Sequence, residues 1–288
     1  MITYEKELVK GVTDVREIPK IACINDLSGF GRCSLVVAST ILSVMGLQPC
    51  LMPTAVLSNH TGYDSYTFLD FTQYMKPFYE QWEKLNLKFA TIYTGFLGSE
   101  QQIDTVAAFI GLHPEANILV DPVMGDDGKP YATYTPQMCE KMRHLTAGAD
   151  MATPNVTEAC ILTDEPYQGD DISFETAISL CRRICAQGTR KVVLTGVHVE
   201  ADIMANVFYN RETGENFMVR QKKVAKKYPG TGDMFASVLC GELTRGADDL
   251  AAVSSAAKFV RKVAAYTAET ETRINDSVIY EPFLKELG

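Results

Sequence analysis

The feature that most constrains the fold is a regular alternation of short apolar runs with longer segments of helical pattern. The apolar runs have the length and composition of buried strands, and they fall at residues 20–24, 89–93, 117–120, 150–153 and 191–194. A further extended segment is expected at residues 49–57. Such alternation is typical of βαβ units, in which helices cover both faces of a parallel sheet. We therefore expect an α/β protein with a central, mostly parallel sheet and helices on both of its faces.

Residues 203–220 break this rhythm. Two extended segments, 203–209 and 216–219, flank Glu212-Thr213-Gly214, and this pattern predicts a small antiparallel hairpin on one edge of the sheet. The remaining segments have helical patterns, and we expect helices close to residues 34–45, 71–85, 99–110, 135–145, 156–163, 172–187, 231–245, 248–269 and 278–286.

The composition is that of an ordinary globular protein, with 46% hydrophobic and 22% charged residues among 288. No linker, low-complexity tract or repeat is visible, so we expect a single domain at residues 19–288 after a polar N-terminal extension at residues 1–18. The net charge of −9 disfavours nucleic acid and anionic membranes as partners. The chain shows no membrane-spanning run, no signal peptide and no C-x-x-C pair among its eight cysteines, which predicts a soluble cytoplasmic protein.

Polar and glycine residues gather where the predicted strands end. In an open parallel sheet a ligand binds beyond the carboxyl ends of the strands, and these ends meet along one rim. We therefore expect a single site built from residues that are far apart in the sequence, namely Asn25, Asp26, Thr54, Thr94, Gly95, Asp121, Thr153, Asn155, Thr195 and Gly196.

The segment Gly230-Thr231-Gly232-Asp233 precedes an apolar helix. Its glycines allow a close backbone approach to a ligand, and the first free amides of the helix can hold an anion. An aspartate here is unfavourable if the site holds only phosphate, but it suits a base beside the hydroxyl that accepts a phosphoryl group. The alternative is a glycine turn in which Asp233 caps the helix.

Several motifs together resemble a known family. Pro229-Gly230-Thr231-Gly232-Asp233-Met234-Phe235-Ala236 resembles the C-terminal signature of the ribokinase-like superfamily. The segments Ser58-Asn59-His60-Thr61-Gly62-Tyr63 and 121–131 resemble its pyridoxal kinase branch, and Asn155-Val156-Thr157-Glu158 matches the Asn-x-x-Glu element of the superfamily. The resemblance extends over roughly residues 20–270 in the same order along the chain.

The resemblance implies a role for each matching residue. Asp233 would be the catalytic base, and Gly230, Thr231 and Gly232 would form the anion hole. Asp121 and Glu158 would organise Mg²⁺, mainly through its waters. The other implied contacts are with ATP, at Asp121, Thr153, Asn155, Glu158, Thr195, Gly196 and Gly232, and with the acceptor, at Asp26, Thr54, Phe96 and Asp233.

These assignments have simpler alternatives. Asp121 could start a turn, Glu158 could be an exposed helix carboxylate, and Thr195-Gly196 could be a strand-end turn. Phe96 could belong to the core. The basic run at 222–227, within a loop at 221–229 that would cover the nucleotide, could be a solvated loop.

The activity implied by the resemblance is ATP-dependent phosphorylation of the 5′-hydroxymethyl group of a vitamin B6 vitamer (pyridoxal, pyridoxine or pyridoxamine), with Mg²⁺. Use of a monovalent cation such as K⁺ stays open, and the resemblance implies a homodimer. One departure opens an alternative, because Asp26-Leu27-Ser28-Gly29 is more similar to the hydroxymethylpyrimidine kinases of thiamine biosynthesis. A third interpretation is a vitamer-binding protein without catalysis, which has no need for a base and metal carboxylates together.

Overall fold

The computed structural model describes residues 17–288, and residues 1–16 of the predicted extension lie outside the described part. Nine strands form one sheet in the order β11-β10-β9-β8-β5-β4-β1-β2-β3. Their bounds are β1 (Lys20–Ser28), β2 (Gln48–Leu57), β3 (Phe68–Asp70), β4 (Thr91–Thr94), β5 (Asn117–Val120), β8 (Met151–Ala152), β9 (Lys191–Glu200), β10 (Ile203–Asn210) and β11 (Asn216–Lys222).

The six strands from β2 to β9 in that order pair in parallel, as the alternating pattern predicts. The predicted edge hairpin is confirmed, because β10 pairs antiparallel with both β9 and β11. At the opposite edge, β3 adds a short antiparallel strand to β2. The expected fold class, a mostly parallel sheet with a small edge hairpin, is therefore correct.

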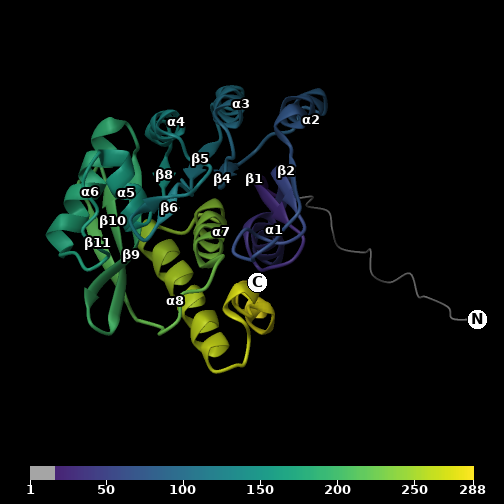
Figure 1. The fold of residues 1–288 in the computed structure, drawn as a ribbon. Helices are drawn as coiled ribbons and strands as arrows, with labels where there is room; N and C mark the ends of the chain where they lie inside the picture. The colour runs from purple at the N-terminus through teal and green to yellow at the C-terminus, as the bar shows by residue number, and fades with distance from the viewer. Residues whose placement is uncertain (1–16) are drawn as a thin grey trace, which may run out of the picture.

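Helices cover both faces of the sheet (Figure 1). One face packs against α1 (Ser34–Val44), α7 (Thr231–Thr244) and α8 (Asp249–Ala268). The other face packs against α2 (Thr72–Lys84), α3 (Glu100–Gly111), α4 (Pro136–Ala147), α5 (Val156–Thr163) and α6 (Phe174–Gln187).

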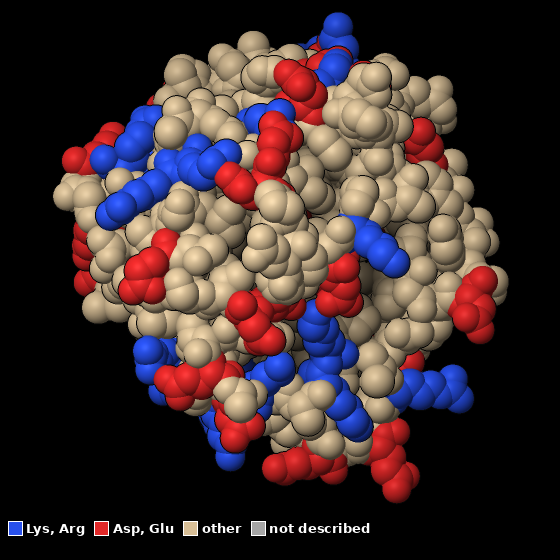
Figure 2. All heavy atoms as spheres, turned by 60° about the vertical axis from the view of Figure 1, so that its left-hand side comes forward, with Lys and Arg blue, Asp and Glu red and all other residues tan. Residues whose placement is uncertain are grey.

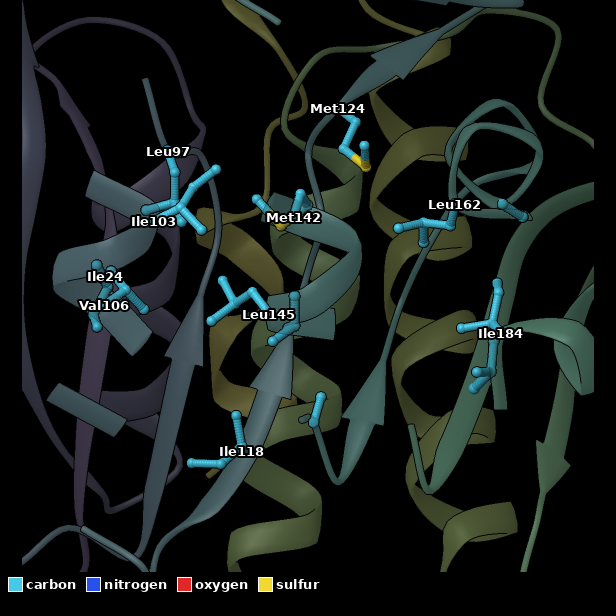
Figure 3. Packing of buried hydrophobic residues seen from close by; sticks show 14 of the residues in the cluster. Ile24, Leu97, Ile103, Val106, Ile118, Met124, Met142, Leu145, Leu162 and Ile184 are labelled. Atoms are coloured by element: carbon cyan, nitrogen blue, oxygen red, sulfur yellow. The ribbon is translucent and has the colours of Figure 1, made fainter. Parts of the chain in front are cut away.

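Each face has its own buried apolar cluster. In the cluster beneath α2–α6, side chains such as Ile103 and Val106 of α3 and Met142 of α4 pack over strand residues such as Ile24 and Ile118 (Figure 3). This two-sided burial explains why the strands are continuous apolar runs and not alternating ones. Within residues 17–288 no helix has the length and apolar character needed to cross a membrane.

Three short elements differ from the sequence prediction. The prediction of a helix at 278–286 is wrong, since this segment contains only the 3-10 helix η2 (Glu281–Glu286); a second one, η1 (Ile274–Asp276), precedes it. Strand β3 and the two-residue pair β6 (Gly125–Asp126) and β7 (Lys129–Pro130) are not predicted at all. Segments of two or three residues carry too little periodicity to be recognised.

Candidate functional site

The carboxyl ends of β5 and β8 bring Asp121 and Thr153 together. The amide of Asp121 donates to Thr94 O (2.9 Å) and that of Thr153 donates to Val120 O (3.1 Å), so the sheet pattern continues past the strand ends. The Thr153 hydroxyl then donates to Asp121 Oδ1 at 3.1 Å. Asp121 is therefore fixed at the rim by the sheet itself and is not part of an exposed turn.

Glu158 lies next to this pair, in the first turn of α5. Its two carboxylate oxygens accept the backbone amides of Met124 and Asn155, each at 2.9 Å. The Asn155 side chain caps the helix in return, accepting the Glu158 amide at 2.9 Å. Since Glu158 is only 4% exposed, the alternative of an exposed helix carboxylate is wrong.

The two buried carboxylates make this part of the rim strongly electronegative. Burial, then the charges of Glu158 and Asp233, raises the pKa of Asp121 well above its usual range. Burial raises the pKa of Glu158 to about 7, against the opposing effect of its backbone hydrogen bonds. In residues 17–288 no lysine or arginine forms an ion pair with either group.

A hydrated Mg²⁺ fits this donor set. Within residues 17–288 no group of three or more histidine, cysteine, aspartate or glutamate side chains could enclose a metal ion. Mg²⁺ keeps several waters and is bound through one or two carboxylates together with phosphate oxygens. Asp121 and Glu158 could supply those carboxylates, and the cation would neutralise their charge.

The glycine turn places Asp233 opposite these groups. Gly230 has φ +77° and ends the loop before α7, and a β-carbon there would lie 2.1 Å from the Arg32 carbonyl oxygen. Only glycine suits both the conformation and the contact. The helix begins at Thr231, so Asp233 lies inside the first turn and the alternative of a capping aspartate is wrong.

Asp233 is half-buried and its carboxylate has few partners. Its Oδ1 accepts the side-chain amide of Asn25 at 3.0 Å. Burial raises the pKa of Asp233 to about 6; the backbone of Ser34 and the Asn25 amide oppose this shift, and the charge of Asp26 adds to it. A carboxyl group with such a pKa is ionised at neutral pH and can still accept a proton, as a general base must.

The predicted acceptor-binding residues lie on the other side of Asp233. Asp26 is buried, and it accepts the hydroxyls of Ser34 (2.5 Å) and Ser28 (2.8 Å). Thr54 has no exposed surface and its hydroxyl donates to Phe96 O at 2.9 Å, which places it behind the Phe96 segment. Phe96 is partly exposed, so it is not simply a core residue.

A cavity of about 580 Å³ opens between Asp233, the carboxylates Asp121 and Glu158, and the loop 221–229. Thr195 and Gly196 line it at the end of the parallel part of β9, and Gly196 has φ +73°. Its lining includes the predicted ATP contacts and the glycine turn, but not Asp26, Thr54 or Phe96. The further predicted residues in the lining are Asp121, Thr153, Asn155, Glu158, Gly230, Thr231, Gly232 and Asp233.

The basic run closes one wall of this cavity. Lys222, Lys223, Lys226 and Lys227 all line it. Lys227 reaches across to Asp127 (2.6 Å), on the turn between β6 and β7, and to Asp170 (3.6 Å). On the surface that carries the β9–β11 end of the sheet, basic and acidic side chains are interspersed (Figure 2). The ion pairs of Lys227 therefore hold the basic loop over the cavity.

Comparison with known proteins decides the family. The family model described as phosphomethylpyrimidine kinase matches residues 43–277. The chain belongs to this family. A protein from Bacteroides thetaiotaomicron that is described as a phosphomethylpyrimidine kinase, and whose crystal structure was solved with pyridoxal, is 40% identical, with a TM-score of 0.89 over 94% of this chain and 96% of that one.

Two curated relatives represent two activities. The pyridoxine/pyridoxal/pyridoxamine kinase of Bordetella avium is 29% identical over 251 residues, which cover 83% of this chain and 82% of the relative. The hydroxymethylpyrimidine/phosphomethylpyrimidine kinase of Staphylococcus aureus is 30% identical over 186 residues, or 62% of this chain and 63% of the relative. The expected resemblance to pyridoxal kinases is thereby confirmed, and the pyrimidine kinases belong to the same group of relatives.

Proposed function

We propose that this kinase transfers the γ-phosphoryl group of ATP to the 5′-hydroxymethyl oxygen of a vitamin B6 vitamer. The position of Asp233 carries the proposal, since it lies between the cavity suited to Mg-ATP and the buried polar side at Asn25 and Asp26. The relative that binds pyridoxal supports the vitamer as acceptor, because it matches nearly the whole chain.

In this proposal Asp233 takes the proton from the acceptor hydroxyl as its oxygen attacks the γ-phosphorus. The first-turn amides at 230–233 point towards the transferred group and, with the dipole of α7, stabilise its negative charge. The left-handed Gly230 sets the direction of these amides. The docked loop at 221–229 excludes water, which would otherwise compete with the vitamer as acceptor.

Asp121 and Glu158 would hold the hydrated Mg²⁺ that accompanies ATP. When bound, this ion supplies positive charge between the carboxylates and the phosphates. Asn155 fixes Glu158 through the capping box, so its proposed role at the metal is indirect. Thr153 holds Asp121, while Thr195 and Gly196 line the cavity where the nucleotide phosphates would lie.

Three broader assignments accompany this function. We propose that residues 19–288 act as one kinase domain, since a single sheet extends from β3 to β11 and α7 and α8 pack on it. The cysteine pattern supports a cytoplasmic location, and the resemblance to pyridoxal kinases supports a homodimer. Both await measurement of localisation and of molecular mass in solution.

A hydroxymethylpyrimidine is the second candidate acceptor. The family model and the Staphylococcus aureus relative favour it. Both candidate acceptors carry a hydroxymethyl group on a nitrogen-containing aromatic ring. The same base and the same nucleotide side would serve either reaction. The choice therefore depends on the acceptor side, around Asp26 and Phe96.

Parallel assays of ADP formation separate the candidates. The full chain is given Mg-ATP with pyridoxal, pyridoxine, pyridoxamine or hydroxymethylpyrimidine, and kcat/KM is determined for each acceptor. We expect the largest value for a B6 vitamer. A larger value for the pyrimidine would reverse the choice of substrate, and binding of a vitamer without any ADP formation would favour a carrier.

A further inference from the structure

Asn25 has a buried side chain. The sequence pattern places it at the rim of the sheet but gives it no role in the reaction. It is 2% exposed and lies near the end of β1, one residue before Asp26. Both of its side-chain polar atoms form hydrogen bonds. Its Oδ1 accepts two backbone amides, from Asp26 and from Phe96, each at 2.9 Å, and its Nδ2 donates to Asp233 Oδ1 at 3.0 Å.

This arrangement fixes the orientation of the amide. Two N–H donors face one end of the Asn25 side chain, so that end is the carbonyl oxygen and the other end is the NH₂ group. The NH₂ group faces Asp233, where the partner is an acceptor. Aspartate would satisfy the two amides equally well, but it would present a second carboxylate to Asp233.

The surrounding chain makes room for this side chain. A β-carbon added at Gly95 would lie 2.2 Å from Asn25 Nδ2 and 2.5 Å from its Cγ. The Gly95 amide donates to Ile24 O at 2.7 Å, which holds the end of β4 against β1 at this point. The lack of a side chain at Gly95, directly after β4, therefore leaves the room that Asn25 occupies.

We infer that Asn25 is the positioning residue of the kinase: it aligns the Asp233 carboxylate with the acceptor hydroxyl and couples it to the backbone of Asp26 and Phe96. This inference rests on the proposed role of Asp233 as base. It adds a second function, since the same amide ties the base to the two segments predicted to bind the acceptor ring. Movement of the ring-binding segments would thus be transmitted to the base.

The selective test is Asn25→Asp, which keeps the acceptor for both backbone amides and changes only the group that faces Asp233. A hydrogen bond to a charged group is replaced by repulsion between two carboxylates, so kcat should fall about 10- to 100-fold at pH 7. KM for ATP should change by less than about threefold, because Asn25 does not line the nucleotide cavity.

The pH profile separates positioning from general damage. Like charge makes ionisation of Asp233 harder, so the acid limb of kcat/KM should move upward by about one unit or more. The loss should be largest near pH 6–7 and become smaller towards pH 9. A loss of equal size at every pH, or unchanged kcat with raised KM for ATP, would overturn the inference.

A second variant disturbs the Asn25 side chain by changing a residue that it contacts. Gly95→Ala pushes on the Asn25 amide and should give the same combination of lower kcat and shifted acid limb. Gly111→Ala is the matched control, since a β-carbon there meets nothing within 4 Å. Asn210→Ala controls for loss of a buried asparagine, because its Oδ1 accepts the Glu212 and Thr213 amides at the β10–β11 turn, remote from the cavity lining.

The outcome distinguishes the inference from the proposed function. If the unmodified chain forms no ADP with any acceptor, the proposed function fails. If the unmodified chain is active and both Asn25→Asp and Gly95→Ala match it in kcat and pH profile, only the inference fails.

Discussion

Asp26 lies near the end of β1 and Asp121 directly after β5, and both are 8% exposed, yet they are held differently. Asp26 accepts two hydroxyls, and these hydrogen bonds oppose the rise in pKa that burial causes. Asp121 accepts one hydroxyl, from Thr153, and faces the charges of Glu158 and Asp233. The acceptor side is thus satisfied by the protein itself, whereas ionisation of the nucleotide side brings negative charges together that a bound cation would balance.

The largest effect expected from this difference concerns the metal requirement. Asp121→Asn removes a carboxylate that would hold Mg²⁺ through water, so the Mg²⁺ concentration needed for half-maximal activity should rise about 10- to 100-fold. Titration of activity with Mg²⁺ at saturating ATP measures it. Asp26→Asn is the matched variant on the acceptor side, and its Mg²⁺ requirement should stay unchanged. An equal rise in both variants would remove the distinction between the two sides.

A smaller effect is expected on stability in the absence of ligands. Burial raises the pKa of Asp121, so the folded state retains a proton that the unfolded state releases, and stability falls as pH rises from about 4 through the folded pKa. Asp121→Asn abolishes this loss. Its Tm at pH 8 should exceed that of the unmodified protein by about 2–4 °C, the shift expected for about 1 kcal/mol.

Thermal unfolding at pH 8 and at pH 4 measures this gain, which should vanish at the lower pH. Asp26→Asn should gain less, because it loses hydrogen bonds from Ser28 and Ser34 to the charged form. Equal gains for the two variants at pH 8 would contradict the contrast between the two sides.

The sequence alone predicts most of the architecture because the long elements carry a strong periodic signal. The parallel strands, the edge hairpin and the helices of eight or more residues all follow from apolar spacing and strand-end glycines. The tail at 281–286 is the exception among the helices, since six residues including Pro282 form only a 3-10 turn. Strand β3 is only three residues long, which is too short for a periodic signal even though Phe68 and Leu69 are apolar.

The sequence predicts the site as far as one rule allows, namely that the carboxyl ends of parallel strands meet at one rim of the sheet. That rule places Asp121, Thr153 and Asn155 together without any knowledge of side-chain contacts. It cannot reveal that Asn25 contacts Asp233, since the two residues are 208 positions apart and no local pattern links them. The rule also does not predict that Glu158 is buried. Its burial depends on the segment after β5, whose Met124 amide donates to the Glu158 carboxylate.

The central claim is that Asp233 takes the proton from the acceptor hydroxyl. Asp233→Asn is nearly isosteric and removes only the base, so kcat should fall by about 10²- to 10⁴-fold, the usual range for losing a general base. Binding of Mg-ATP should persist. The acid limb of kcat/KM at saturating Mg-ATP, expected near the Asp233 pKa of about 6, should be lost in the variant.

The decisive measurement is therefore kcat and the pH profile of kcat/KM for Asp233→Asn beside the unmodified chain, with the acceptor that gives the fastest ADP formation. We expect kcat to fall at least about 100-fold, with nucleotide binding intact and no acid limb near pH 6. Turnover close to that of the unmodified chain, with the same acid limb, would contradict it.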